Sequence, residues 1–529
     1  MDSELTTADP PGDMAPVMRR GRNALAALLG AGVALVTIEI VALFDAKGVS
    51  VTEAVQNRFI RDFAGSLKQT AIDLFGTNDK AALQIGTALV VLALGALLGA
   101  LAGRRTSVLL AGFGGFAVLG IVVAFGDPLA SGPVSVVAAL LGAGLGVATT
   151  VLLERWWNGE SAVVTGRSAR IPASAALSRR TVLASGGATA VVLLFGAAAA
   201  RAVRSSIRTT AVAVRRVLPA PVRRVATPTN QPFEVAGASP YITPTADFYR
   251  IDTALRIPVV DADTWSLKIT GMVENELTIT YADLLKRDLV EVPITIQCVS
   301  NEVGGDLIGT ARWTGVPLAE LLKEAGVKDG VDQIMGESVD GFTAGFPLAA
   351  GIDGRDSLLA IGMNGRVLEA EHGFPARLII PGLYGYISAT KWIKEIRLTT
   401  FDAEQGFWVP RGWSADGPIK LQSRIDVPRY GDSVPAGAQA IGGVAWAPHT
   451  GVKAVEVQID KGPWRKAELA KVASVDTWVQ WRFKWNAKPG SHEIKVRAVD
   501  LNGKFQTGEL AAPAPDGATG HHTIDVEVA

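Results

Sequence analysis

Cysteine is nearly absent from this chain, which contains only Cys298 among its 529 residues. One thiol cannot form a disulfide within the chain, and it cannot supply a four-cysteine zinc or iron–sulfur site. Haem attachment through a C-x-x-C-H motif is excluded for the same reason. Net charge is also absent, because 51 basic residues balance 51 acidic ones. The composition therefore gives no indication that nucleic acid is a partner.

Charge is scarce in long stretches of the first 200 residues, where five apolar runs stand out. Each run is close to the ~20 residues that a helix needs to cross a bilayer. Five such runs in succession favour membrane spans over buried core helices. We therefore expect residues 1–200 to form a multi-pass transmembrane region, with spans at about 24–44, 81–102, 107–125, 133–153 and 182–200.

Arginine clusters indicate how these spans are oriented. If all five runs cross the membrane, the clusters before the first run, after the second and after the fourth fall on one side. The positive-inside rule places that side in the cytoplasm and everything after residue 200 outside. The clusters are Arg19, Arg20 and Arg22; Arg104 and Arg105; and Arg155, Arg167, Arg170, Arg179 and Arg180.

A further basic stretch after the fifth run, from Arg201 to Arg224, opposes ordinary insertion in this orientation. Residues 178–183 (SRRTVL) resemble a twin-arginine export signal, a route that carries folded proteins. The alternative is an arginine pair that marks the cytoplasmic end of a helix. We expect a protein of the cell membrane whose soluble half lies on the extracytoplasmic side.

Histidine is missing from the membrane half, because all five histidines lie at or after His372. A membrane haem held by two histidines is thereby excluded. Glu39 is the sole acidic residue within an apolar run; such residues often have functional roles, although this one can equally face a neighbouring helix. The helices therefore indicate anchoring rather than a transport path.

The soluble half indicates further domains. We expect 201–235 to be a basic linker and 236–423 to be an α+β domain, with strands such as 264–270 and 292–298. Alternating strands separated by turns predict an immunoglobulin-like β-sandwich at 424–529, without the paired cysteines of antibody domains. The expected fold class is thus multi-domain, with a helical membrane region, an α+β domain and a β-sandwich.

Cys298 ends an apolar strand and leads into a loop that contains Gly304 and Gly305. The edge between a strand and a loop can hold a functional side chain rigidly at a cleft. A free cysteine is equally often a small buried core residue. Position alone leaves both interpretations open.

The surrounding motifs favour a functional cysteine. TIQCVSNEVGGDLIGTARWTGVPL (295–318) resembles the cysteine loop of the sulfite oxidase family of molybdenum enzymes. The C-terminal sandwich resembles the dimerisation domain of sulfite oxidases, and the resemblance covers roughly 236–529 but not the membrane half. Further motifs are similar in the same order, namely YITP (241–244) through FYR (248–250), SVDG (338–341), HGFPARL (372–378), IIPGLYG (379–385) and SATKW (388–392).

The resemblance implies a molybdenum–molybdopterin cofactor, with Cys298 as the catalytic residue and the protein ligand of the metal. A soft thiolate suits such a centre, and Arg377 and Lys391 suit the pterin phosphate. A structural ion pair for Arg377 and an ordinary loop histidine for His372 remain alternatives. The residues that the resemblance places at the cofactor are Asp247, Tyr249, Arg250, Asp340, His372, Arg377, Ser388, Thr390 and Lys391.

One motif departs from the family pattern. Animal and plant members carry an Arg-Asn-His run in the opening segment, which holds the substrate anion, whereas the nearby run here is Ile251-Asp252-Thr253. An acidic Asp252 near the pocket would repel sulfite. The haem domain of the animal enzyme has no counterpart here, so no haem is expected within this chain. Electrons are then expected to pass to a separate carrier, such as a cytochrome or a quinone.

The resemblance implies an enzyme that performs two-electron oxygen-atom transfer on a small sulfur-containing or similar substrate. Some exported relatives reduce sulfoxides, so the direction of catalysis stays open, as does a homodimer through the C-terminal domain. Two further alternatives are a hydrolase with Cys298 as nucleophile and His372 as base, and a non-catalytic membrane-bound binding protein.

Overall fold

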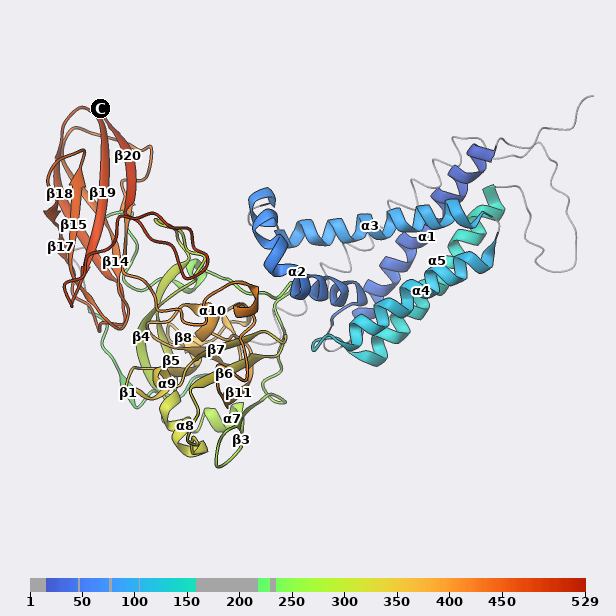
Figure 1. Ribbon diagram of the computed structural model, residues 1–529, viewed down its shortest axis with the longest axis horizontal. Coiled ribbons are helices and arrows are strands. Elements are labelled where there is room, and N and C mark those ends of the chain that lie inside the picture. The colour runs from blue at the N-terminus through green and yellow to red at the C-terminus, as the bar shows by residue number, and fades with distance from the viewer. Residues whose placement is uncertain (1–15, 46–47, 76–78, 104, 158–216, 229–234) are drawn as a thin grey trace, which may run out of the picture. The chain divides into compact units, whose positions relative to one another are not determined.

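The structure, a computed structural model, describes residues 16–45, 48–75, 79–103, 105–157, 217–228 and 235–529 (Figure 1). The chain divides into two compact units, Met1–Thr209 and Thr210–Ala529. Each unit has hydrophobic clusters of its own.

Apolar helices dominate the described part of the first unit. Four of them are long and apolar enough to cross a membrane, and they coincide with the first four runs expected from the sequence. The fifth expected run, 182–200, and the Arg179–Arg180 pair lie outside the described residues. The four spans are Arg20–Ala42 within α1 (Pro16–Ala42), Lys80–Ala102 within α3 (Asp79–Ala102), α4 (Thr106–Phe125) and α5 (Gly132–Trp157).

Small residues allow α1 to pack closely against α3 and α5. A Cβ atom at Gly30 would lie 2.5 Å from the carbonyl oxygen of Gly146, and one at Gly99 would lie 2.3 Å from that of Asn23. Helices in a bilayer gain little from the hydrophobic effect, so close backbone packing of this kind stabilises them. The glycine-rich and alanine-rich composition of the runs is therefore also a packing feature.

The helix α2 (Val51–Phe75) was not predicted from the apolar runs, because charged residues interrupt it throughout. The segment that leads into it forms a hydrogen bond with Glu39, the acidic residue of α1. Ser50 Oγ donates to Glu39 Oε1 at 2.7 Å, and both residues are buried. Glu39 thus faces a neighbouring element, and this hydrogen bond offsets part of the cost of its burial.

Two sheets form the first part of the second unit, and their side chains share one hydrophobic core. The first sheet has the order β1-β4-β5-β8-β10, with β9 beside β8, and comprises β1 (Arg223–Arg224), β4 (Val290–Gln297), β5 (Ile308–Pro317), β8 (Leu358–Met363), β9 (Arg366–Val367) and β10 (Arg377–Ile379). The second has the order β3-β2-β11-β6-β7 and comprises β3 (Leu277–Thr280), β2 (Ser266–Gly271), β11 (Ile393–Thr399), β6 (Gln333–Ser338) and β7 (Thr343–Pro347).

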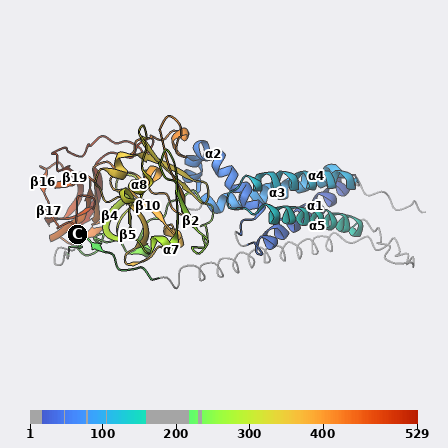
Figure 2. The same cartoon turned by 90° about the horizontal axis from the view of Figure 1, so that it is seen from below.

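Short helices lie between these strands, in agreement with the α+β domain predicted from the sequence (Figure 2). The helix α7 (Tyr281–Leu284) begins at a capping box, in which Thr280 Oγ1 accepts from the Asp283 amide and Asp283 Oδ2 accepts from the Thr280 amide. The helical segments are η3 (Thr245–Asp247), α7 (Tyr281–Leu284), α8 (Leu318–Ala325), α9 (Ala349–Ile352), η4 (Ala370–His372), α10 (Gly385–Ser388) and η5 (Val409–Arg411).

Part of the stretch expected to be a linker joins the first sheet. Arg223 and Arg224 form β1, which pairs in parallel with Val290 and Glu291 of β4. The Val222 amide donates to the Leu289 carbonyl at 2.8 Å, and the Val225 amide donates to the Glu291 carbonyl at 2.9 Å, which extends this pairing by one residue on each side.

The C-terminal region consists of two mainly antiparallel sheets around a common core, at the upper left of Figure 1. In β18 the side chains of Val479, Trp481, Phe483 and Trp485 alternate with polar ones, and these four belong to that core. One sheet comprises β12 (Gln422–Val427), β14 (Gly437–Trp446), β18 (Val479–Ala487) and β17 (Glu468–Leu469). The other comprises β13 (Ser433–Val434), β20 (His522–Val528), β19 (Gly490–Asp500), β15 (Val452–Ile459) and β16 (Arg465–Lys466).

The C-terminal region packs against β4. Trp446 Nε1 donates to Gln297 Oε1 at 2.9 Å, and the Trp478 amide donates to Thr295 Oγ1 at 2.7 Å. Every residue of β4 is buried, because one face meets the domain core and the other meets these contacts. The strand that leads to Cys298 is therefore held from both sides.

Candidate active site

Cys298 directly follows β4, and its side chain is buried. Its amide donates to the Leu307 carbonyl at 2.9 Å, and its carbonyl accepts from the Asn301 amide at 3.0 Å. Asn301 Oδ1 in turn accepts from the Leu307 amide at 2.8 Å. These bonds close the loop after Cys298 and restrict how far its thiol can move.

Two C-terminal residues hold the same loop from outside. Arg424 Nη1 donates to the Gly305 carbonyl at 2.7 Å, and Arg424 Nη2 donates to Ser239 Oγ at 2.8 Å. Gly304 has φ of 81°, and a Cβ atom there would lie 2.3 Å from the His522 ring. Glycine is required here for both reasons, since its backbone is left-handed and the ring approaches it closely.

Arg377 lies at the start of β10, buried, with its guanidinium carbon 5.1 Å from the centre of the Trp313 ring. Its Nη1 donates to the His372 carbonyl at 3.1 Å. Its Nε is buried and has no hydrogen-bond partner among the described residues. Burial lowers the pKa of Arg377 to about 10, so the group stays cationic at neutral pH.

His372 is buried beside Arg377, and burial lowers its pKa to about 4, with the charge of Arg377 acting in the same direction. Its Nε2 lies 3.2 Å from the Thr245 carbonyl oxygen, which assigns the proton of the neutral ring to Nε2. A base with this pKa accepts a proton poorly at neutral pH, because general bases work best near the ambient pH. This weighs against a hydrolase in which His372 activates Cys298.

Lys391 forms a closed ion pair with Asp252. The two charged atoms lie 2.7 Å apart, and the side chains are 8% and 12% exposed. Lys391 Nζ also donates to the Glu371 carbonyl at 3.2 Å. Burial raises the pKa of Asp340. The charge of Asp252 adds to this rise and the charge of Lys391 opposes it, which shows that Asp340 lies close to the pair.

The structure brings Tyr249 and Thr390 to the buried cluster as well. Burial raises the pKa of Tyr249, Cys298 adds to the rise, and Arg377 opposes it, so this phenol lies close to both groups. Thr390 is fully buried, and its Oγ1 has no hydrogen-bond partner in the described part of the chain.

The other predicted residues lie in less enclosed positions or have local partners. Ser388 Oγ donates to the Tyr384 carbonyl at 2.9 Å within α10. Arg250 is half-exposed and pairs with Glu371. Asp247 is exposed at the end of η3.

Similarity to known proteins identifies the family of this chain. Residues 254–408 match the family described as "Oxidoreductase molybdopterin binding domain". Over 157 residues the chain is 31% identical to the uncharacterized oxidoreductase YuiH of Bacillus subtilis, which covers 30% of this chain and 76% of that protein. The chain belongs to the sulfite oxidase family of molybdopterin-binding oxidoreductases.

Longer members of the sulfite oxidase family are similar over about half of the chain. The mitochondrial sulfite oxidase of Rattus norvegicus is 29% identical over 320 residues, which are 51% of this chain and 58% of that enzyme's length. The structure of the sulfane dehydrogenase SoxCD of Paracoccus pantotrophus is similar with a TM-score of 0.46 and 23% identity, over 56% of this chain and 87% of that one. The chain thus spans little more than half the length of the rat enzyme.

The residues around Cys298 fit the cofactor of the sulfite oxidase family. Arg377 Nε, Thr390 Oγ1 and Asn301 Nδ2 are buried without a hydrogen-bond partner among the described residues. Buried polar groups are rarely left unpaired, and a phosphate or a pterin offers the acceptors that these atoms lack. Cys298 adds the soft donor that a molybdenum ion requires.

The sequence interpretation did not assign roles to Asn301 and Trp313. Asn301 lies three residues after Cys298, within the segment 295–318 that resembles the cysteine loop of the family, and this position could have identified it. Trp313 has no comparable signal, since its contact with Arg377 arises only when β5 and β10 lie on the two sides of β8.

Proposed function

We propose that this protein is a membrane-anchored, molybdopterin-dependent oxidoreductase that transfers an oxygen atom to or from a small sulfur-containing substrate. The observation that carries the proposal is the position of Cys298, at the end of a fully buried strand, in a domain that also holds buried polar atoms with no hydrogen-bond partner among the described residues. When bound, the cofactor would supply the two-electron chemistry of oxygen-atom transfer.

The side chains have distinct roles in this proposal. Cys298 would ligate the metal, and the loop bonds of Asn301 would hold it in place. Arg377 and Thr390 would donate hydrogen bonds to the cofactor from Nε and Oγ1. His372, neutral at physiological pH, would orient the backbone around Thr245 rather than transfer a proton.

The remaining predicted residues, Asp247, Tyr249, Arg250, Asp340, Ser388 and Lys391, are proposed to line the cofactor pocket. Among them Ser388 would act by stabilising α10, because its hydroxyl already donates within that helix. Lys391 would act together with Asp252, which neutralises it.

Charge balance favours sulfoxide reduction as a second candidate function. Lys391 is paired with Asp252, and Arg250 is paired with Glu371. These two cations therefore carry counter-charges and attract an anion weakly. An uncharged substrate such as a sulfoxide suits these surroundings better than sulfite does.

The location and assembly belong to the same proposal. The four apolar helices support anchoring, and we propose that the catalytic part is exported by the twin-arginine route to the extracytoplasmic side. We also propose an immunoglobulin-like domain at 424–529 that mediates dimerisation, after the cofactor domain at 236–423 and the linker at 201–235. A cytochrome or a quinone would exchange electrons with the site.

Metal content together with a substrate screen tests the proposal. Full-length protein from cells supplied with molybdate is expected to contain molybdenum, whereas Cys298→Ser is expected to lose turnover and keep its melting temperature. Arg429→Ser is the control, because that residue is exposed in the C-terminal region. Metal-free protein from molybdate-supplied cells would contradict the proposal. Turnover with sulfoxides but not with sulfite would select the second candidate.

A further inference from the structure

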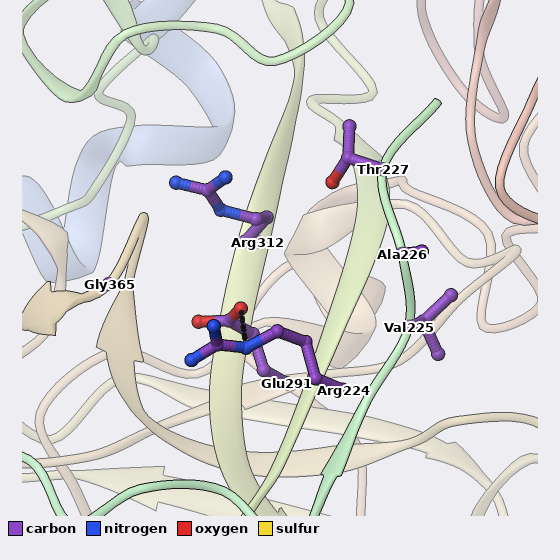
Figure 3. A pocket seen from close by; sticks show the side chains of 7 residues that line it. All are labelled: Arg224, Val225, Ala226, Thr227, Glu291, Arg312 and Gly365. Atoms are coloured by element: carbon purple, nitrogen blue, oxygen red, sulfur yellow. Dashed lines mark ion pairs between the residues drawn. The ribbon is translucent and has the colours of Figure 1, made fainter. Parts of the chain in front are cut away.

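A cavity of about 300 Å³ lies outside the site described above. It is formed at the edge of the first sheet by β1, the start of β4, β5 and the turn between β8 and β9 (Figure 3). Its lining residues are Arg224, Val225, Ala226, Thr227, Glu291, Arg312 and Gly365.

The cavity and the Cys298 site lie on opposite faces of the sheet. Side chains alternate along a strand, so Glu291 and Cys298 project from opposite faces of β4. Arg312 likewise faces away from Trp313, whose ring contacts Arg377. Glu291 and Cys298 are also separated by roughly 20 Å along the extended strand. A ligand in the cavity would therefore not contact the Cys298 site.

Charge in the cavity is unbalanced. Arg224 Nε lies 2.9 Å from Glu291 Oε1, which pairs these two groups. Arg312 forms no ion pair within the described part of the chain, and its Nε is buried without a hydrogen-bond partner. Figure 3 shows the Arg312 guanidinium on one side and the Arg224–Glu291 pair on the other. Two guanidinium groups and one carboxylate leave one net positive charge.

We propose that this cavity binds a small carboxylate anion and that Arg312 is the residue that holds it. A buried donor without a partner costs free energy, and an anion removes that cost while balancing the charge. The buried carboxylate of Glu291 disfavours a doubly charged ligand such as phosphate. The volume lies at the lower end of the range for small-molecule pockets, which suits a compact ligand.

Ligand-observed NMR with ¹³C-labelled pyruvate tests the site on the full-length protein. Saturable binding is expected in carboxylate-free buffer of low ionic strength, with weaker competition by phosphate and none by methyl pyruvate, which lacks the charge. Arg312→Gln is expected to weaken pyruvate binding by about tenfold or more, because a charge-assisted hydrogen bond is lost. Arg429→Gln makes the same chemical change on the exposed surface and should bind pyruvate normally.

Thermal stability separates a ligand site from a folding role for Arg312. Without pyruvate, Arg312→Gln should melt at or above the temperature of the unchanged protein, because an unpaired buried donor is removed. With pyruvate, only the unchanged protein and Arg429→Gln should gain stability. Absence of saturable binding, or equal binding by Arg312→Gln, would overturn the proposal. Molybdenum content should be the same in all three proteins, so the result is independent of the proposed redox function.

Discussion

Lys391 Nζ and Asp252 Oδ2 lie 2.7 Å apart in a pair that is almost closed to solvent. Each charge offsets the desolvation of the other, and each would be costly to bury alone. The expected repulsion between Asp252 and an anionic substrate is therefore reduced, but so is any attraction by Lys391.

Replacement of Asp252 by Asn should destabilise the fold, because it leaves Lys391 buried without its counter-charge. Breaking a buried pair typically costs about 3–5 kcal/mol. Thermal melting and urea unfolding of the full chain measure this loss. Asp329→Asn, at an exposed position, is the matched control and should leave the melting temperature unchanged. An equal effect of both substitutions would show that the pair contributes no special stability.

The low pKa of His372 predicts that stability falls in mild acid. The unfolded chain binds a proton near the ordinary pKa of 6.5, whereas the folded ring binds one only near 4. Stability is therefore full above about pH 6.5 and declines as the pH drops toward 4, by on the order of 3 kcal/mol. His522, whose pKa burial also lowers to about 4, contributes in the same way.

Unfolding free energies at pH 7 and pH 5 check this prediction. His372→Gln should show a smaller difference between the two pH values than the unchanged protein. His522→Gln should do the same, and the double variant should lose both contributions. If His372→Gln keeps the full pH dependence, the buried neutral state assigned to this ring is wrong.

The bond from Arg424 to the Gly305 carbonyl predicts that the C-terminal region limits access to Cys298. Arg424→Lys keeps the charge but loses the planar fork that also reaches Ser239 and Asp426. In protein produced without molybdate, alkylation of Cys298 should then be faster by roughly tenfold, as expected when a charge-assisted hydrogen bond is lost.

Labelling is specific, because Cys298 is the single cysteine of the chain. Arg429→Lys supplies the control, since its side chain is exposed in the same region. Equal alkylation rates in both variants would mean that Arg424 stabilises the C-terminal region without holding the loop.

Local patterns predicted much of the fold. The first four apolar runs agree with the four candidate spans, and the strands expected at 264–270 and 292–298 occur as β2 and β4. Both results depend on short-range properties, namely apolar length and β-branched composition. The helix α2 was missed, because its charged residues interrupt the apolar pattern on which the prediction of helices in this region depended.

The sequence by itself determined the family, because the motifs around Cys298, His372 and Lys391 occur in the family's order along the chain. Only the tertiary structure decided the charge state of their surroundings. Lys391 and Asp252 are 139 residues apart in the chain, and Arg377 acquires an unpaired buried Nε only when β10 packs beside β8. Desolvation and ion pairing depend on groups that meet through the fold, and such encounters leave no local pattern in the sequence.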